Sequence, residues 1–168
     1  AAEYLRIIGD FERIADHSVN ILESAEEMQQ KGIAFSAAAL QEYATMAGAV
    51  REVTALAYDS FVSGDVQAAR QVEPLEQVID DLKEEMRTRH IRRMQQGSCG
   101  IEAGFIWSDL LTNLERVSDH CSNIACCMIE GADHNLHRHE VLQSIRGSGE
   151  IFDREYSYYR QKYALTAE

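Results

Sequence analysis

The sequence has very little proline, no long apolar run and far fewer basic than acidic residues. Its 168 residues include one proline, Pro74, and are dominated by Ala, Glu, Gln, Leu, Arg and Met, which favour helices. No apolar run approaches the ~18 residues that a membrane helix needs. The net charge of −12 disfavours nucleic acid as a partner, because binding to phosphate backbones needs positive charge. The sequence therefore predicts an all-α globular domain.

Several motifs that carry chemistry are also missing. The four cysteines form no C-x-x-C pair and no Cys₂His₂ spacing, which leaves them as small apolar side chains. No Glu is followed by a His three residues later, which argues against a ferritin-like di-iron centre. No phosphate-binding loop, hydrolase serine motif or nucleophile with a nearby base is visible. We therefore expect a protein that is not an enzyme.

Capping residues and glycines divide the chain into helices. Gly32 and Gly64 are expected to end the first two helices, and Ser36 and Asp65 to cap the second and third. Pro74 should kink the third helix or mark its true first turn. About five long helices are expected, over residues 1–31, 37–63, 66–96, 101–130 and 135–163, the last of them interrupted near Gly147-Ser148-Gly149. Helices of this length with short loops predict an antiparallel bundle. The last contains an aromatic stripe that should be buried, formed by Phe152, Tyr156, Tyr159 and Tyr163.

A short segment occurs twice. Residues 12–21 read ERIADHSVNI and residues 115–124 read ERVSDHCSNI, so six of ten positions are identical at an offset of 103. Chance rarely produces such a match within one short chain. We interpret it as a duplicated supersecondary unit.

Both copies carry a Glu and an Asp four residues apart, Glu12 with Asp16 and Glu115 with Asp119. Residues at this spacing lie on one face of a helix, where like charges cost a few tenths of a kcal/mol. The first pair is flanked by apolar residues, Ile8, Ala15, Val19 and Leu22. We therefore expect its carboxylates to border the buried face, where they would protonate or pair with a cation.

A third such pair, Glu76 and Asp80, lies in the third helix. Three acidic rows on facing helices could converge, and oxygen ligands suit Mg²⁺, Ca²⁺, Mn²⁺, Fe or Zn²⁺. The six carboxylates are therefore a candidate metal site of unknown metal. The alternative is an ordinary acidic face paired with Arg or Lys.

The histidines and the basic residues have simpler interpretations. His17 and His120 follow the Asp directly and point about 100° away from it, which favours helix packing over metal binding. A second histidine group consists of His134, His137 and His139 with Glu140. It could bind a metal but is more typical of an exposed helix start. The third helix ends in Arg87, Arg89, His90, Arg92 and Arg93, a solvated end or a docking patch for an acidic partner.

The segments GDFERIADHSVNI and LERVSDHCSNIA resemble the signature helices of the PhoU family. The resemblance extends over about residues 5–130 and implies a spectrin-like three-helix unit with extra helices. In this family Glu-x-x-x-Asp motifs bind metal clusters in some members. The motif positions correspond directly to Glu12, Asp16, Glu115 and Asp119, and more loosely to Glu76 and Asp80.

The layout differs from that of a complete family member. The chain opens inside an amphipathic helix, without a cap, a signal peptide or an initiator Met, which predicts a fragment of a longer protein. By the resemblance, 1–31 is the first motif helix, 36–131 a three-helix unit and 134–165 a helical extension of one domain, 1–168. The extension is similar to the end of bacterial sodium/phosphate cotransporters, whose C-terminal cytoplasmic part is PhoU-like.

The resemblance implies a regulatory module in phosphate uptake, cytoplasmic and tethered through an upstream membrane part. It would bind metal through the acidic motifs and dock a phosphate transporter or a signalling protein. By the resemblance, a complete member has two further helices before the first motif helix. The fifth helix or a second copy of the chain, as a homodimer, could fill the place that these two helices would take beside the first helix. The alternative function is a metal-free helical scaffold or dimerisation module.

Overall fold

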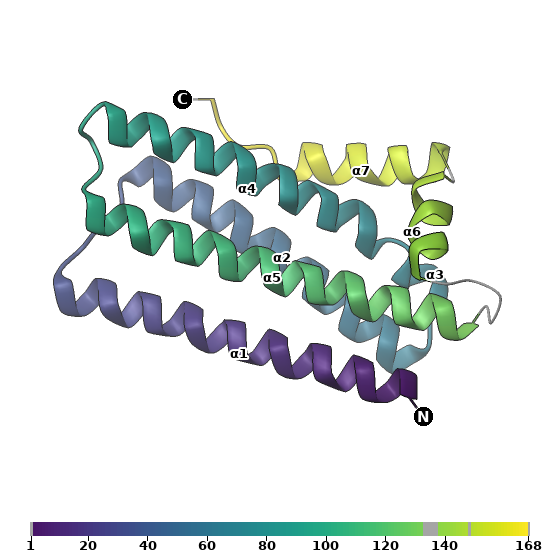
Figure 1. Cartoon of the computed structure of the whole chain (residues 1–168). Helices are drawn as coiled ribbons and strands as arrows, with labels where there is room; N and C mark the ends of the chain where they lie inside the picture. The colour runs from purple at the N-terminus through teal and green to yellow at the C-terminus, as the bar shows by residue number, and fades with distance from the viewer. Residues whose placement is uncertain (1, 133–137, 148, 168) are drawn as a thin grey trace.

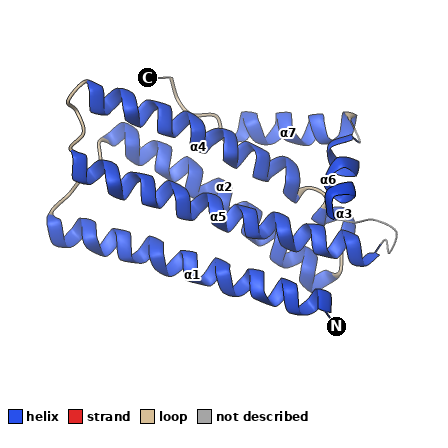
Figure 2. Ribbon diagram, viewed as in Figure 1, coloured by secondary structure: helices blue, strands red, loops and turns tan. Residues whose placement is uncertain are grey.

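The computed structural model describes residues 2–132, 138–147 and 149–167, and these residues form helices and their connections without any strand (Figures 1 and 2). The helices are α1 (Ala2–Lys31), α2 (Ala37–Ser63), α3 (Val66–Ala69), α4 (Val72–Gln95), α5 (Ile101–Ala132), α6 (Arg138–Gly147) and α7 (Glu150–Lys162). The all-α prediction is confirmed. Among the described residues the C-terminal stretch divides into α6 and α7 at the interruption expected near Gly147 and Gly149, which leaves four long helices and two shorter ones there.

The predicted caps form as expected. The Ser36 side chain accepts a hydrogen bond from the backbone N–H of Ala39 at 3.2 Å, which satisfies one of the free donors at the start of α2. Gly64 ends α2 with a φ of 69°, a left-handed conformation that glycine adopts without steric cost. Asp65 then caps α3 through the backbone N–H groups of residues 67 and 68.

The expected third helix is interrupted before Pro74. The chain forms the short α3, turns through residues 70 and 71, and restarts at Val72. Pro74 lies in the first turn of α4, where its missing N–H leaves no helical hydrogen bond unmade. The proline therefore marks the first turn of α4, one of the two outcomes that the sequence predicted.

The helix α5 lies at the centre of the bundle and packs against α1, α2 and α4 (Figure 1). The helices α2 and α4 also contact each other, so α2, α4 and α5 form a group of three. The helix α1 runs antiparallel to α5 along its other side. The side chains buried most completely come mainly from these helices and include Met46, Val53, Leu75, Ile79 and Ile124. The α2, α4 and α5 helices thus enclose most of the core.

The C-terminal helices cover α4 and α5. The helix α6 packs against α5 and α7 packs against α4, on the side of the bundle away from α1 (Figure 1). Tyr159 is buried, and Phe152, Tyr156 and Tyr163 are partly buried against the core, as the stripe predicted. The expectation that the fifth helix could fill the place beside the first helix is wrong, because α7 packs against α4 and Tyr163 lies against α2.

No helix in the described parts of the chain is both long and apolar enough to cross a membrane.

Candidate metal centre

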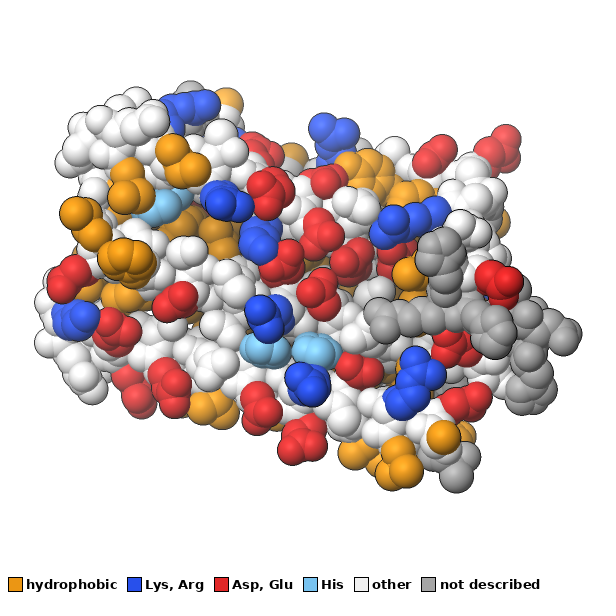
Figure 3. Space-filling view, viewed as in Figure 1, with side chains coloured by type: hydrophobic (Ala, Val, Ile, Leu, Met, Phe, Trp, Pro, Cys, Tyr) orange, Lys and Arg blue, Asp and Glu red, His pale blue; other side chains and the backbone are white. Residues whose placement is uncertain are grey.

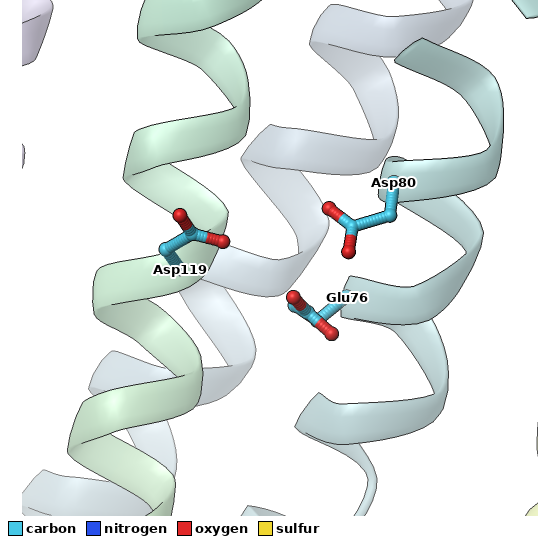
Figure 4. Close-up of side chains that lie close together, drawn as sticks. All are labelled: Glu76, Asp80 and Asp119. Atoms are coloured by element: carbon cyan, nitrogen blue, oxygen red, sulfur yellow. The ribbon is translucent and has the colours of Figure 1, made fainter. Parts of the chain in front are cut away.

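Three carboxylates from two helices meet in one cluster. Glu76 and Asp80 lie one turn apart on α4, and Asp119 reaches toward them from α5 (Figure 4). One oxygen of each lies within 4.8 Å of the corresponding oxygens of the other two. The spacing of four residues places Glu76 and Asp80 on the same face of α4, and the packing of α4 on α5 supplies the third carboxylate.

The solvent exposure of the three residues increases from Glu76 through Asp80 to Asp119. The Glu76 side chain belongs to a residue that is only 8% exposed, Asp80 is half-buried and Asp119 is exposed. The Oε2 atom of Glu76 and the Oδ1 atom of Asp80 are buried without a hydrogen-bond partner among the described residues. Leaving such groups unpaired costs about 1–3 kcal/mol each, or more when they are charged. Asp119 gives the cluster an opening to solvent.

Burial and the proximity of other carboxylates raise the pKa values of all three side chains. Burial raises the pKa of Glu76 to about 9, and the charges of Glu73, Asp80 and Asp119 add to the rise. Burial, followed by the charges of Asp119 and Glu115, raises the pKa of Asp80 to about 6. The pKa of Asp119 is raised by burial and by the Glu115 charge. Without a cation, Glu76 therefore keeps its proton at neutral pH.

Two carboxylates beside the cluster already have partners. Glu73 accepts a hydrogen bond from the Ser122 hydroxyl at 2.8 Å and pairs with Arg146 of α6 at 2.8 Å. Glu115 pairs with Lys83 of α4. Glu73 and Glu115 are therefore paired, whereas Glu76 and Asp80 each keep a buried oxygen without a partner among the described residues.

The donor set fits a cation that prefers oxygen. Three carboxylates, two of them with an unpaired buried oxygen, offer the ligands that Mg²⁺, Ca²⁺, Mn²⁺ and iron select, and Zn²⁺ also accepts them. A bound cation would neutralise the charges that raise the pKa of Glu76 and Asp80. Glu76, Asp80 and Asp119 are the residues that would hold it.

The structure brings together only part of the predicted site. Glu76, Asp80 and Asp119 meet, and Glu115 lies beside them in its ion pair with Lys83. Glu12 and Asp16 are exposed on α1 and do not join the group. The first acidic row therefore does not converge with the other two in this chain.

The expected burial around Glu12 and Asp16 is wrong. Ile8, Val19 and Leu22 are 58%, 53% and 58% exposed, and Ala15 is also exposed. The reason is that α1 packs on α5 and the edge of α2 through another face, which carries Ile7, Phe11 and Ile14. No described helix covers the face that carries the acidic row.

The histidines of the repeat join α1 to α5. The His17 and His120 rings stack with centroids 5.5 Å apart. His17 Nδ1 donates to Asn113 Oδ1 at 2.9 Å, and His120 Nδ1 donates to Asp10 Oδ1 at 2.8 Å. Positions 10 and 113 differ by 103, the offset of the repeat, so the two contacts are related by an approximate two-fold axis between the helices. These contacts agree with a packing role.

Sequence reasoning missed three residues at the edge of the cluster, Glu73, Ser122 and Arg146. The signal for Glu73 was available, because it precedes Glu76 by three residues and so lies on nearly the same face of α4. Nothing local marks Arg146, whose role depends on where α6 packs. His134, His137 and His139 of the second histidine group lie outside the residues whose side chains the structure describes.

Comparison with known proteins gives relatives of one kind. The chain is 28% identical over 149 residues to the phosphate-specific transport system accessory protein PhoU homolog 1 of Thermotoga maritima, covering 89% of this chain and 63% of that protein. It is 25% identical over 124 residues to the PhoU homolog of Deinococcus radiodurans, covering 72% of this chain and 55% of the relative. The chain thus spans less than two thirds of the length of either relative.

No solved structure gave a significant match. The family model described as "PhoU domain" matches residues 43–128, which is slightly more than half of the chain. The matched segment runs from α2 through α5 and includes all three carboxylates of the cluster. The chain therefore belongs to the PhoU domain family.

Proposed function

We propose that the chain is a non-enzymatic regulatory domain in phosphate uptake, which binds a metal ion and docks a component of a phosphate transport system. Its relatives, which are accessory proteins of phosphate-specific transport systems, support this role. The similarity of its C-terminal segment to sodium/phosphate cotransporters supports the finer proposal, that it is the cytoplasmic part of a sodium-dependent phosphate transporter.

One observation carries the metal-binding part. Glu76 Oε2 and Asp80 Oδ1 are buried without partners next to a third carboxylate, Asp119. Folded proteins rarely leave buried carboxylate oxygens unpaired, and a cation would satisfy them and remove their mutual repulsion. Metal binding would then hold α4 against α5 and fix the surface that a partner meets.

Metal content tests this proposal directly. The metal-free chain would be dialysed against Mn²⁺, Fe²⁺, Zn²⁺, Ca²⁺ or Mg²⁺, and the bound ion measured by elemental analysis. We expect binding in the wild type and its loss in Glu76→Gln/Asp119→Asn. The control is Glu12→Gln/Asp16→Asn, which makes the same chemical change on the exposed face of α1. An ion at a hundred times its Kd should stabilise the wild type by about 2.7 kcal/mol.

Two results would contradict the metal-binding proposal. One is a wild type that takes up none of these ions and gains no thermal stability from them. The other is equal binding by both double variants, which would mean that the acidic surface attracts ions without a specific site.

The regulatory part needs a cellular measurement. Phosphate uptake would be compared in cells that carry the natural full-length protein, with and without Glu76→Gln/Asp119→Asn. We expect the variant to alter the dependence of uptake on external phosphate. An unchanged dependence, with normal protein levels, would contradict a regulatory role for the cluster.

The dimerisation alternative rests on a different observation, the exposed apolar side chains of Ile8, Val19 and Leu22. A face of this kind suits packing against another helix. Sedimentation equilibrium of the wild type and of Val19→Glu would decide it. A dimer that Val19→Glu dissociates supports the alternative, and a monomer over the full concentration range excludes it.

A further inference from the structure

A groove runs between the C-terminal half of α4 and the N-terminal half of α5. It has a volume of about 490 Å³ and extends from Lys83 to Met94 along α4 and from Ile101 to Thr112 along α5. The two helices are antiparallel, so Met94 and Ile101 lie at one end of the groove and Lys83 and Thr112 at the other. Each wall covers about three helical turns, or about 16 Å.

One end of the groove is apolar and open to solvent. Ile101 and Phe105 are each 70% exposed, Ile91 is 48% exposed and Met94 is 39% exposed. Figure 3 shows hydrophobic side chains gathered at the left of the molecule, over the ends of α4 and α5. Isolated exposed apolar residues are common, but four that line one groove indicate an interaction surface.

The other end of the groove is basic, although the chain has a net charge of −12. Lys83 and Arg87 line this end, one turn apart on α4. Lys83 is held by Glu115, whereas Arg87 is exposed and pairs with no carboxylate of the described residues. The free guanidinium would attract a carboxylate on whatever occupies the groove.

The floor of the groove is firmly packed. Trp107 is 1% exposed and stacks edge-on against Phe35, with ring centroids 5.0 Å apart. A Cβ atom at Gly104 would lie 3.1 Å from His90 Nε2, so the ring of His90 occupies the space that a side chain would need. Trp107 Nε1 is buried without an acceptor among the described residues. Because these side chains are packed, the groove is already formed without a ligand.

We propose that this groove docks an amphipathic α-helix of a partner protein, with apolar side chains at one end of its inner face and a carboxylate at the other. A helix of about 12 residues has the required length. Its apolar side chains would cover Phe105 and Ile101, and its Asp or Glu would pair with Arg87. The inference rests on the docking role proposed above but not on the metal centre.

Peptide selection on the intact chain tests the inference. A displayed library of random peptides of about 14 residues would be selected against the chain, and the affinities of the enriched peptides measured. Binding would be followed by the fluorescence of Trp107, the single tryptophan, which lines the groove. We expect helical peptides with apolar residues at i, i+3 or i+4 and an Asp or Glu about two turns away.

Variants of the chain locate the binding site. Phe105→Glu and Arg87→Glu should each weaken binding at least about tenfold. Val62→Glu is the matched control, because Val62 is 65% exposed on α2, outside the groove, and should leave affinity unchanged. Replacing the acidic residue of the peptide by Lys should restore binding to Arg87→Glu, which a loss of folding could not explain.

The remaining outcomes overturn the inference. If no peptide is enriched, or if the enriched peptides bind Phe105→Glu and Arg87→Glu as tightly as the wild type, the groove does not dock a helix. Self-association that Phe105→Glu abolishes would assign the groove to a second copy. Binding to vesicles of anionic lipid that both variants abolish would assign it to a membrane surface. Metal binding is measured on the same variants, so that failure here leaves the proposal for the acidic cluster separately tested.

Discussion

The two copies of the repeat share six of ten residues but have different surroundings. On α5, Leu111 is 3% exposed and Ser118 is fully buried, because α2 and α4 pack there. The equivalent positions on α1 are Ile8, which is 58% exposed, and Ala15, which is also exposed. The comparison teaches that the motif supplies an acidic row, and that a neighbouring helix is needed to turn this row into a site.

The largest expected effect comes from truncating the apolar side chains at positions 8 and 111, which precede the two copies and are related by the same offset of 103. Leu111→Ala should lower the free energy of unfolding by about 2–5 kcal/mol, because it leaves a cavity in the core. Ile8→Ala should change it by less than about 0.5 kcal/mol, because the side chain is already exposed. Urea unfolding of both variants measures the difference. Equal losses would show that the α1 face is buried in solution, and so overturn the comparison.

The second effect concerns charge at the cluster. Glu76→Gln should stabilise the metal-free protein by about 1–3 kcal/mol at pH 8, since it removes a buried acid that is costly to ionise. The folded state holds the Glu76 proton up to a pKa of about 9, whereas the unfolded state releases it at an ordinary carboxyl pKa. Folding stability should therefore fall as the pH rises between these two values, and the variant should flatten this fall.

Thermal unfolding of the metal-free protein from pH 5 to pH 9 tests this expectation, with Glu12→Gln as the exposed counterpart. The control variant should keep the slope of the wild type. A wild type whose stability rises steadily over this range would mean that Glu76 is not a buried acid.

A smaller effect is expected where the histidines of the repeat join α1 to α5. Asp10→Asn keeps an acceptor for His120 but removes the charge, and so makes this contact resemble that between Asn113 and His17. The loss of stability should be about 0.5–1 kcal/mol at low salt. Calorimetry of the wild type and the variant would show it as a small fall in Tm. An unchanged Tm would mean that the charge of Asp10 contributes nothing to the packing of α1.

The smallest effect belongs to the exposed acidic row. Asp16→Asn relieves the repulsion between like charges four residues apart, so the helix should gain only a few tenths of a kcal/mol. Chemical unfolding should place the variant slightly above the wild type in stability. A gain as large as that of Glu76→Gln would show that α1 carries a buried cluster of its own.

Helix positions were predictable because their determinants are local. Ser36 and Asp65 cap helices through their own side chains, Gly64 ends one through its own backbone, and Pro74 lies where a missing N–H costs nothing. Each of these effects involves residues within a few positions of one another. The interruption of the last helix near Gly147 and Gly149 was predictable for the same reason, because glycine favours a break in a helix, and α6 ends at Gly147 while α7 begins at Glu150.

The carboxylates of the cluster could be predicted from the sequence, but the residues that pair with their neighbour Glu73 could not. The spacing of Glu76 and Asp80 fixes a shared face of α4, and Asp119 follows from the repeat. The partners Arg146 and Ser122 depend on how α6 and α5 pack near Glu73, across more than 45 positions of sequence. Such long-range contacts leave no local signal.

The sequence by itself determined that the chain is helical, where its helices are capped, and that acidic rows recur at an offset of 103. These properties follow from backbone preferences and from the 3.6-residue period of the helix. Only the tertiary structure decided which row becomes a cluster. The cost of burying a carboxylate depends on what surrounds it, and α4 and α5 surround Glu76 while nothing described covers Glu12.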